Sequence, residues 1–203
     1  MLYQLKSADV LFSGIDLVPI NYMNFPWKWG DLTNEVSLRF LCRLAALNFT
    51  PVFEFGTFRG RTTYNLALNS PSVVTIDIGS NKNLDEVPEG KSYPSYISGE
   101  LLKGSKVESK VEQIVGDSTK VDLSSRYKTF GLVLVDGGHS YEVCRSDTVN
   151  ALRLVRNGGI IVWDDYSSYW PEVQKVINEF ALKYDMLHLL QEGFVLLKNG
   201  YKE

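Results

Sequence analysis

The chain has 203 residues, of which 44% are hydrophobic and 22% are charged, as in an ordinary globular protein. This length allows one sizeable core but not two comfortable domains, so we expect a single domain. The net charge of -3 and the pI of about 5.5, without any block of Lys or Arg, give no electrostatic support for a nucleic-acid partner.

The sequence also lacks the features of export and of membrane insertion. Residues 1–10 contain no charged lead-in followed by an apolar core, so no secretory signal is predicted. No apolar run reaches membrane-spanning length. Cys42 and Cys144 lie in helical patterns without partners at metal-binding spacing, which predicts buried thiols in a reducing cytoplasm. We therefore expect a cytoplasmic protein with no membrane partner.

Residues 1–30 show no strong periodicity. They include an aromatic stretch at 21–30 that Pro26 and Gly30 interrupt. Such a segment cannot build a core by itself, so we expect an N-terminal arm that covers a hydrophobic face, or alternatively a lid over a site. The single domain is then expected to span 31–203.

The segment from Pro51 to Leu68 predicts a buried strand, a tight glycine turn and a helix. A short apolar run carries one acid, Glu54, and ends at Gly56, and good helix formers follow Gly60. Such a turn presents backbone N–H groups to a ligand that lies across the strand end and the helix start. The spacing E-x-G-x-x-x-G differs from the G-x-G-x-x-G of dinucleotide sites, and a carboxylate would repel a pyrophosphate. We therefore expect a ligand with a cationic group or hydroxyls.

Strands and helices alternate through most of the remaining chain. Further buried strands are predicted at 72–77, 111–115, 130–135 and 159–163, and helices at about 140–156 and from 171 onwards. Residues 79–110 interrupt this rhythm with Gly, Ser, Pro, Lys and Glu. We expect this segment to be a long functional excursion, such as a lid, or to be partly disordered.

Two short apolar runs, at 186–190 and 194–197, follow with only a short link between them. Such a link cannot form the crossover that a parallel pair requires, so these runs predict an antiparallel hairpin. Five strand–helix repeats and this hairpin predict an α/β fold with a Rossmann-like, doubly wound sheet of seven strands, the last of them antiparallel.

Acidic residues stand at the ends of all five predicted strands that precede the hairpin. In an open α/β sheet the ligand lies over the carboxyl ends of the strands, so these side chains are expected to come together. Each acid taken singly reads as a helix N-cap or a solvated loop residue, but chance does not readily place acids at all five ends. The acids are Glu54, Asp77, Asp117, Asp136 and the pair Asp164–Asp165.

These motifs resemble those of the class I S-adenosylmethionine-dependent methyltransferases, over the sequence from about Glu35 onwards. The glycine turn resembles the first motif of that family, and the later motifs recur in order. The resemblance implies that Asp77 accepts hydrogen bonds from the ribose hydroxyls of S-adenosylmethionine, and that Asp117 and Ser118 flank its adenine. The residues implied for cofactor binding are Glu54, Gly56, Thr57, Gly60, Asp77, Ile78, Asp117, Ser118 and Asp136.

The remaining acids favour a divalent metal. Carboxylates from adjacent strand ends suit a hard ion such as Mg²⁺ or Mn²⁺. The cation-dependent, catechol-type O-methyltransferases hold such an ion with an Asp after the fourth strand and an Asp-Asn pair after the fifth. Asp136 and Asp164 match this pattern, whereas Asp165 stands where that family has Asn. The resemblance implies a metal site of Asp136, Asp164 and Asp165.

His139 is the candidate general base. It lies three residues beyond Asp136, where the catechol-type family has its basic lysine. Histidine can accept a proton near neutral pH without a large change of pKa. A structural role, as a helix-capping or metal-adjacent histidine, is an equal alternative, and His188 in the terminal hairpin is expected to be structural.

We therefore expect a methyltransferase that moves a methyl group from S-adenosylmethionine to an oxygen of a small molecule, with Asp136 and His139 as catalytic residues. A sugar, another polyol or a catechol-like phenol fits best, with Mg²⁺ or Mn²⁺ helping to acidify its hydroxyl. One alternative is a metal-independent methyltransferase, in which Asp164 and Asp165 are ordinary loop acids. Another is a non-catalytic module that binds the nucleoside. The sequence leaves the acceptor and the formation of a homo-oligomer open.

Overall fold

The computed structural model describes residues 2–5, 35–47, 49–80, 96–189 and 193–200. Its strands and helices follow the alternation that the sequence predicts. In chain order the elements are β1 (Leu2–Leu5), α1 (Glu35–Ala46), β2 (Val52–Phe55), α2 (Arg61–Asn69), β3 (Val73–Asp77), the 3-10 helix η3 (Glu108–Lys110), β4 (Val111–Val115), the 3-10 helix η4 (Ser124–Arg126), β5 (Phe130–Val135), α3 (Tyr141–Leu154), β6 (Val155–Trp163), α4 (Pro171–Ala181), β7 (Met186–Leu189) and β8 (Phe194–Lys198).

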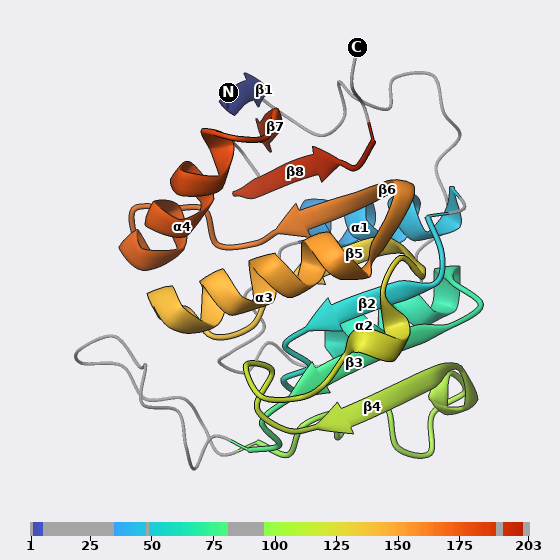
Figure 1. Ribbon diagram of the computed structural model, residues 1–203. Coiled ribbons are helices and arrows are strands. Elements are labelled where there is room, and N and C mark those ends of the chain that lie inside the picture. The colour runs from blue at the N-terminus through green and yellow to red at the C-terminus, as the bar shows by residue number, and fades with distance from the viewer. Residues whose placement is uncertain (1, 6–34, 48, 81–95, 190–192, 201–203) are drawn as a thin grey trace.

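All eight strands of the described residues form one sheet, in the order β1-β7-β8-β6-β5-β2-β3-β4. Strands β2 to β6 pair in parallel with one another, whereas β8 runs antiparallel to both β6 and β7 (Figure 1). The predicted sheet of seven strands, with the last one antiparallel, is therefore confirmed in β2 to β8. Strand β1 adds an eighth strand at the edge, parallel to β7.

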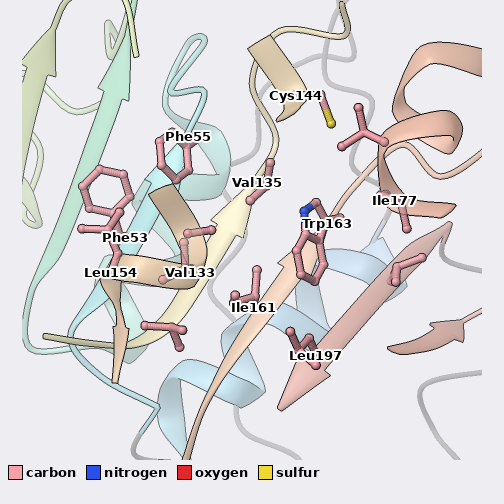
Figure 2. Packing of buried hydrophobic residues seen from close by; sticks show 14 of the residues in the cluster. Phe53, Phe55, Val133, Val135, Cys144, Leu154, Ile161, Trp163, Ile177 and Leu197 are labelled. Carbon is pink, nitrogen blue, oxygen red and sulfur yellow. The ribbon is translucent and has the colours of Figure 1, made fainter. Parts of the chain in front are cut away.

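Helices cover both faces of the sheet. Helices α3 and α4 lie on one face, and α1 and α2 lie on the other (Figure 1). Successive side chains of a strand point to opposite faces, so in β5 Val133 packs toward α3 and α4, whereas Leu132 packs toward α1 and α2. Because both faces are buried, the central strands read as continuous apolar runs, and not as alternating ones. Figure 2 shows the first of these layers around Trp163.

The boundary between α3 and β6 differs from the prediction. Helix α3 begins after its N-cap, Ser140, whose Oγ accepts a hydrogen bond from the N–H of Val143 at 3.4 Å. It ends at Leu154, two residues before the predicted end, and β6 begins at once with Val155. Gly158, of a residue type that commonly ends helices, instead lies within β6 with a φ of 75°, where the pairing with β5 shifts register.

Two predicted segments are described only in part. In the N-terminal arm, residues 2–5 form β1, while the aromatic stretch at 21–30 lies outside the described residues. In the excursion at 79–110, residues 81–95 lie outside them, and residues 96–110 consist of turns, a single-residue bridge and η3.

Cys42 and Cys144 are both buried, as predicted, and burial raises the pKa of each thiol to about 12. Among the helices that the structure describes, none combines the length and the apolar content that crossing a membrane requires.

A buried hydrogen bond ties β6 to α3 and generates a test of the core. The Nε1–H of Trp163 donates to Oγ1 of Thr148 at 2.9 Å, and both side chains are buried. In Thr148→Val the indole N–H loses its partner, which should lower the free energy of unfolding by about 1–3 kcal/mol. The double variant Trp163→Phe/Thr148→Val removes both polar groups, so its loss should be smaller than the sum of the two single losses. Urea denaturation measures all three, with Thr129→Val at an exposed threonine as the control. Simple additivity of the two losses would contradict this role for the bond.

Candidate active site

The carboxyl ends of β2 to β6 lie along one edge of the sheet, because these strands are parallel. Every acid that the sequence analysis identified stands at or just after one of these ends. The structure therefore brings the predicted residues to one edge. The contacts of each residue decide what it can do there.

The glycine turn between β2 and α2 has no room for side chains at its first position. Gly56 has a φ of 90°, and a Cβ on it would lie 1.8 Å from the carbonyl oxygen of Asp136. Gly60, with a φ of 92°, is the N-cap of α2. These positive φ angles are readily accessible only to glycine. The turn thus brings bare backbone against the end of β5. Its role in binding a ligand stays a prediction.

Asp77, at the end of β3, is bonded to the backbone of this turn. Its Oδ2 accepts hydrogen bonds from the N–H groups of Thr57 at 3.1 Å and Phe58 at 2.9 Å. Its Oδ1 accepts one from the N–H of Gly79 at 2.8 Å. A carboxylate offers about four lone-pair positions, so Asp77 can hold the turn and still accept a bond from a ligand hydroxyl. Ile78, the next residue, is 42% exposed.

Glu54 lies beneath the turn and not on its surface. The side chain is fully buried, and Oγ1 of Thr63 donates a hydrogen bond to its Oε2 at 2.5 Å. Nearby, the hydroxyls of Thr57 and Thr75 lie 2.7 Å apart. Burial raises the pKa of Glu54 to about 8, against the effect of the threonine hydroxyls. Glu54 is placed to support the turn from inside.

Asp117 and Ser118 follow β4 and differ in their surroundings. Asp117 pairs with Lys120 at 2.6 Å and accepts bonds from Thr119, and these contacts lower the pKa of its carboxyl to about 2. Ser118 bonds instead to Asp147 of α3, which is buried and has no hydrogen-bond partner for Oδ1 among the described residues. Burial raises the pKa of Asp147 to about 7.

Three acids lie close together at the ends of β5 and β6, namely Asp136, Asp164 and Asp165. Burial, then the charges of Asp164, Asp165 and Glu54, raise the pKa of Asp136 well above its usual range. Burial, then the charge of Asp165, raises the pKa of Asp164 to about 8. Asp136 and Asp164 are each partly exposed as whole residues. Protein nevertheless surrounds their carboxyl groups, so the loss of hydration there is the main cause of the raised pKa.

Two of these acids already have hydrogen-bond partners within the protein. Oδ1 of Asp164 accepts a bond from the N–H of Asp165 at 2.7 Å, and the carboxylate of Asp165 faces His139. Within the described part of the chain, no group of three or more His, Cys, Asp or Glu side chains is arranged to hold a metal ion. The three residues as placed do not fit the predicted ligand set, and the metal site stays a prediction.

His139, Asp165 and Trp170 form a compact unit. Nε2 of His139 lies 2.7 Å from Oδ2 of Asp165, and the imidazole stacks on the indole of Trp170 with ring centroids 3.7 Å apart and planes 10° apart. Asp165 has a φ of 62°, an uncommon conformation for a residue other than glycine. Such backbone strain is often found at functional sites. The unit holds the imidazole in one orientation.

A groove among the described residues lies away from the strand ends. It has a volume of about 780 Å³ and runs along the outer side of α3, from Tyr141 to Arg153, opposite the residues from Thr119 to Tyr127. None of the predicted site residues lines it. The groove is therefore not the site that the strand ends form.

Comparison with known proteins identifies the family. Residues 53–166, more than half of the chain, match a family described as a methyltransferase domain. The chain belongs to this methyltransferase family. S-adenosylmethionine is the methyl donor that the family implies. The strand order β4-β3-β2-β5-β6-β8-β7 is the methyltransferase topology.

Several solved methyltransferase structures share this fold. The O-methyltransferase NovP has a TM-score of 0.60 and 15% identity, covering 81% of this chain and 78% of its own. The cofactor-bound protein Rv0187 from MTB has a TM-score of 0.56 and 21% identity, covering 83% and 82%. CalS11, a TDP-rhamnose 3'-O-methyltransferase of calicheamicin biosynthesis, has a TM-score of 0.58 and 16% identity, covering 83% and 82%. No curated protein matches the sequence.

Sequence analysis missed two residues that the structure places at this edge. Asp147 stands between Cys144 and Ala151 on the buried stripe of α3, so a carboxylate at an inward helical position was a usable signal. Trp170, just before Pro171, gave no such signal, because its contact with His139 depends on how two loops meet.

The buried Asp147 generates a prediction about stability and pH. Its folded-state pKa of about 7 lies above the ordinary value of 3.8, so the folded protein binds this proton more tightly than the unfolded chain. Its contribution to stability is fully present below about pH 4 and is lost as the pH rises to about 7, by at most about 4 kcal/mol.

The variant Asp147→Asn should therefore show a flatter fall of the free energy of unfolding between pH 4 and pH 7 than the wild type, in urea denaturation. The pKa values of Glu54 and Asp164 are also raised in the folded protein. Part of the fall in the free energy of unfolding with rising pH should therefore remain in the variant. Asp122→Asn, at an exposed carboxyl whose pKa the N–H of Ser124 lowers, is the control with the opposite sign. Identical slopes in the wild type and Asp147→Asn would rule out the raised pKa.

Proposed function

We propose that the protein transfers a methyl group from S-adenosylmethionine to a hydroxyl oxygen of a small molecule, with His139 as the general base. The observation that carries this proposal is the His139–Asp165 pair. The two residues follow β5 and β6, and the glycine turn lies against the end of β5. A sugar, another polyol or a phenol is the proposed acceptor. NovP and CalS11, which share the fold, are O-methyltransferases by name, and CalS11 acts on TDP-rhamnose.

The cofactor is proposed to lie across the ends of β2, β3 and β4. The bare backbone from Gly56 to Gly60 would face its methionine part, and the free acceptor position of Asp77 would take a ribose hydroxyl. Ile78 and Ser118 would flank the adenine.

The chemistry requires a hydroxyl to lose its proton as its oxygen attacks. Bound S-adenosylmethionine supplies an electrophilic methyl carbon, whose bond to sulfur breaks as the new carbon–oxygen bond forms. Asp165 accepts the Nε2–H of His139, which leaves Nδ1 of the neutral imidazole as the atom that takes the proton. Asp165 then stabilises the imidazolium, and the parallel ring of Trp170 fixes its plane.

Binding of S-adenosylhomocysteine tests the placement of the cofactor. Asp77→Asn loses the charge that strengthens its bond to a ribose hydroxyl, and a charge-assisted bond contributes about 1.5–3 kcal/mol, so affinity should fall at least about tenfold. Isothermal titration calorimetry gives the affinity. Thermal unfolding of the same variant separates this effect from loosening of the turn, which Asp77 also holds. The control is Asp122→Asn, where an exposed aspartate likewise caps a local N–H. Equal affinity of Asp77→Asn and wild type would remove Asp77 from the cofactor site.

Turnover tests the base. Formation of S-adenosylhomocysteine is followed with a panel of nucleotide sugars, polyols and catechols as acceptors. With an accepted substrate, His139→Gln should slow turnover by about 10²–10⁴-fold and leave the affinity for S-adenosylhomocysteine unchanged, because it removes only the proton acceptor. Asp165→Asn should slow turnover in the same direction, and Glu172→Gln, an exposed acid on α4, should not. A His139→Gln rate close to that of the wild type would exclude His139 as the base.

A second candidate is transfer assisted by a divalent cation. It is favoured by the mutual repulsion of Asp136, Asp164 and Asp165, which a bound cation would relieve. It is disfavoured by the engagement of Asp165 with His139. EDTA added to the turnover assay distinguishes the two. Activity that persists supports the base acting without a metal, and activity that is lost and then restored by Mg²⁺ or Mn²⁺ supports the cation.

A further inference from the structure

The residues Tyr96–Leu102, here called the brace, pack directly on the glycine turn although they lie some 40 residues further along the chain. The N–H of Gly99 donates to the carbonyl of Phe58 at 2.8 Å, and the N–H of Leu101 donates to the carbonyl of Arg59 at 3.0 Å. At its other side, the hydroxyl of Ser98 accepts a bond from the side chain of Gln113, on β4, at 2.7 Å. The brace thus connects the turn to the edge strand of the sheet.

Side chains reinforce these backbone contacts. The ring of Tyr96, which is 6% exposed, lies with its centroid 4.5 Å from that of Phe58. Glu100 forms an ion pair with Arg59. Leu102 fills the space above Gly60, where a Cβ would lie 2.8 Å from its Cγ. Burial and the nearby charge of Asp77 raise the pKa of Tyr96 to about 12, which agrees with a phenol close to that carboxylate.

Phe58 explains what these contacts do. Its φ of 47° lies in the left-handed region, which aromatic residues rarely adopt because of the clash of Cβ with the backbone. Its N–H is held by Asp77, its carbonyl by Gly99, and its ring by Tyr96. A strained residue persists where its surroundings determine its conformation, and here the brace provides two of the three contacts.

We propose that the brace is a positioning element for the cofactor: it holds Phe58 in the left-handed conformation that the turn needs to present its backbone and to keep Asp77 in place. This inference rests on the proposed binding of S-adenosylmethionine at the turn. It assigns Tyr96 and Glu100 to cofactor affinity, although neither stands at a strand end.

The test uses the affinity of the full-length chain for S-adenosylhomocysteine, measured by calorimetry. Tyr96→Ala removes the ring that holds Phe58, so affinity should fall about tenfold, whereas Tyr96→Phe keeps the ring and should stay within about twofold of the wild type. Asparagine tolerates left-handed backbone better than phenylalanine, so Phe58→Asn needs the brace less. The double variant Tyr96→Ala/Phe58→Asn should therefore bind at least about threefold more tightly than Tyr96→Ala alone.

A merely structural role for the tyrosine ring predicts the opposite, because the double variant loses more packing than the single one. Tyr127→Ala, at a partly exposed tyrosine beside the outer groove, is the control and should not change the affinity. The inference is overturned if Tyr96→Ala binds as tightly as the wild type, or if the double variant binds no better than Tyr96→Ala.

If thermal unfolding shows that Tyr96→Ala does not fold, a matched pair of ion-pair variants decides. Glu100→Gln should weaken binding about two- to threefold, roughly the effect of a partly buried ion pair, and Glu112→Gln, which breaks the Arg126 pair outside the turn, should not. Equal affinities of these two variants overturn the inference.

A wild type that does not bind S-adenosylhomocysteine overturns the proposed function and the inference together. If the wild type binds but the brace variants do not show the expected changes, only the inference is overturned and the proposed function stands.

Discussion

The close approach of Gly56 to the backbone of Asp136 is the constraint on which the site depends. The ends of β2 and β5 meet there with no side chain between them, and the N–H of Asp136 also donates to the carbonyl of Phe55 at 3.0 Å. The separation between the glycine turn and the acidic edge that carries His139 is therefore set by backbone contacts. Backbone packed in this way has few alternative arrangements, so a cofactor held on one side and a base held on the other keep a fixed spacing.

The second general property of the site is its concentration of carboxyl groups. Glu54, Asp136 and Asp164 all have a raised pKa, because burial and mutual repulsion disfavour their ionised forms. Any negative charge that these carboxyl groups keep lies in a buried environment of low dielectric constant, where it is poorly screened. A sulfonium cofactor carries a positive charge that its product lacks. On the proposed function, this edge would hold the cofactor by an attraction that ends when the methyl group leaves, which favours release of the product.

The fold was largely readable from the sequence, because strands buried on both faces, the glycine turn and the short hairpin link are local signals. The positions of the site acids were readable for the same reason, since each lies at or near the end of a strand. Their contacts were not. The bond of Asp165 to His139 spans 26 residues and depends on a φ of 62°. The bonds of Asp77 to the turn depend on the register of two strands, and the partner of Trp170 depends on how two loops meet. Strand β1 is too short to leave a periodic pattern.

The two buried cysteines give each helical layer its own chemical reporter. Cys42 lies on α1, on one face of the sheet. Cys144, which Figure 2 labels, lies on α3, on the other face. With pKa values near 12, neither thiol is ionised or accessible while its layer stays closed. The rate at which a thiol reagent modifies each cysteine therefore reports how often that layer opens. Mass spectrometry of the peptides that contain Cys42 and Cys144 would show whether the helical layer with α3 opens together with the layer that contains α1, or separately from it.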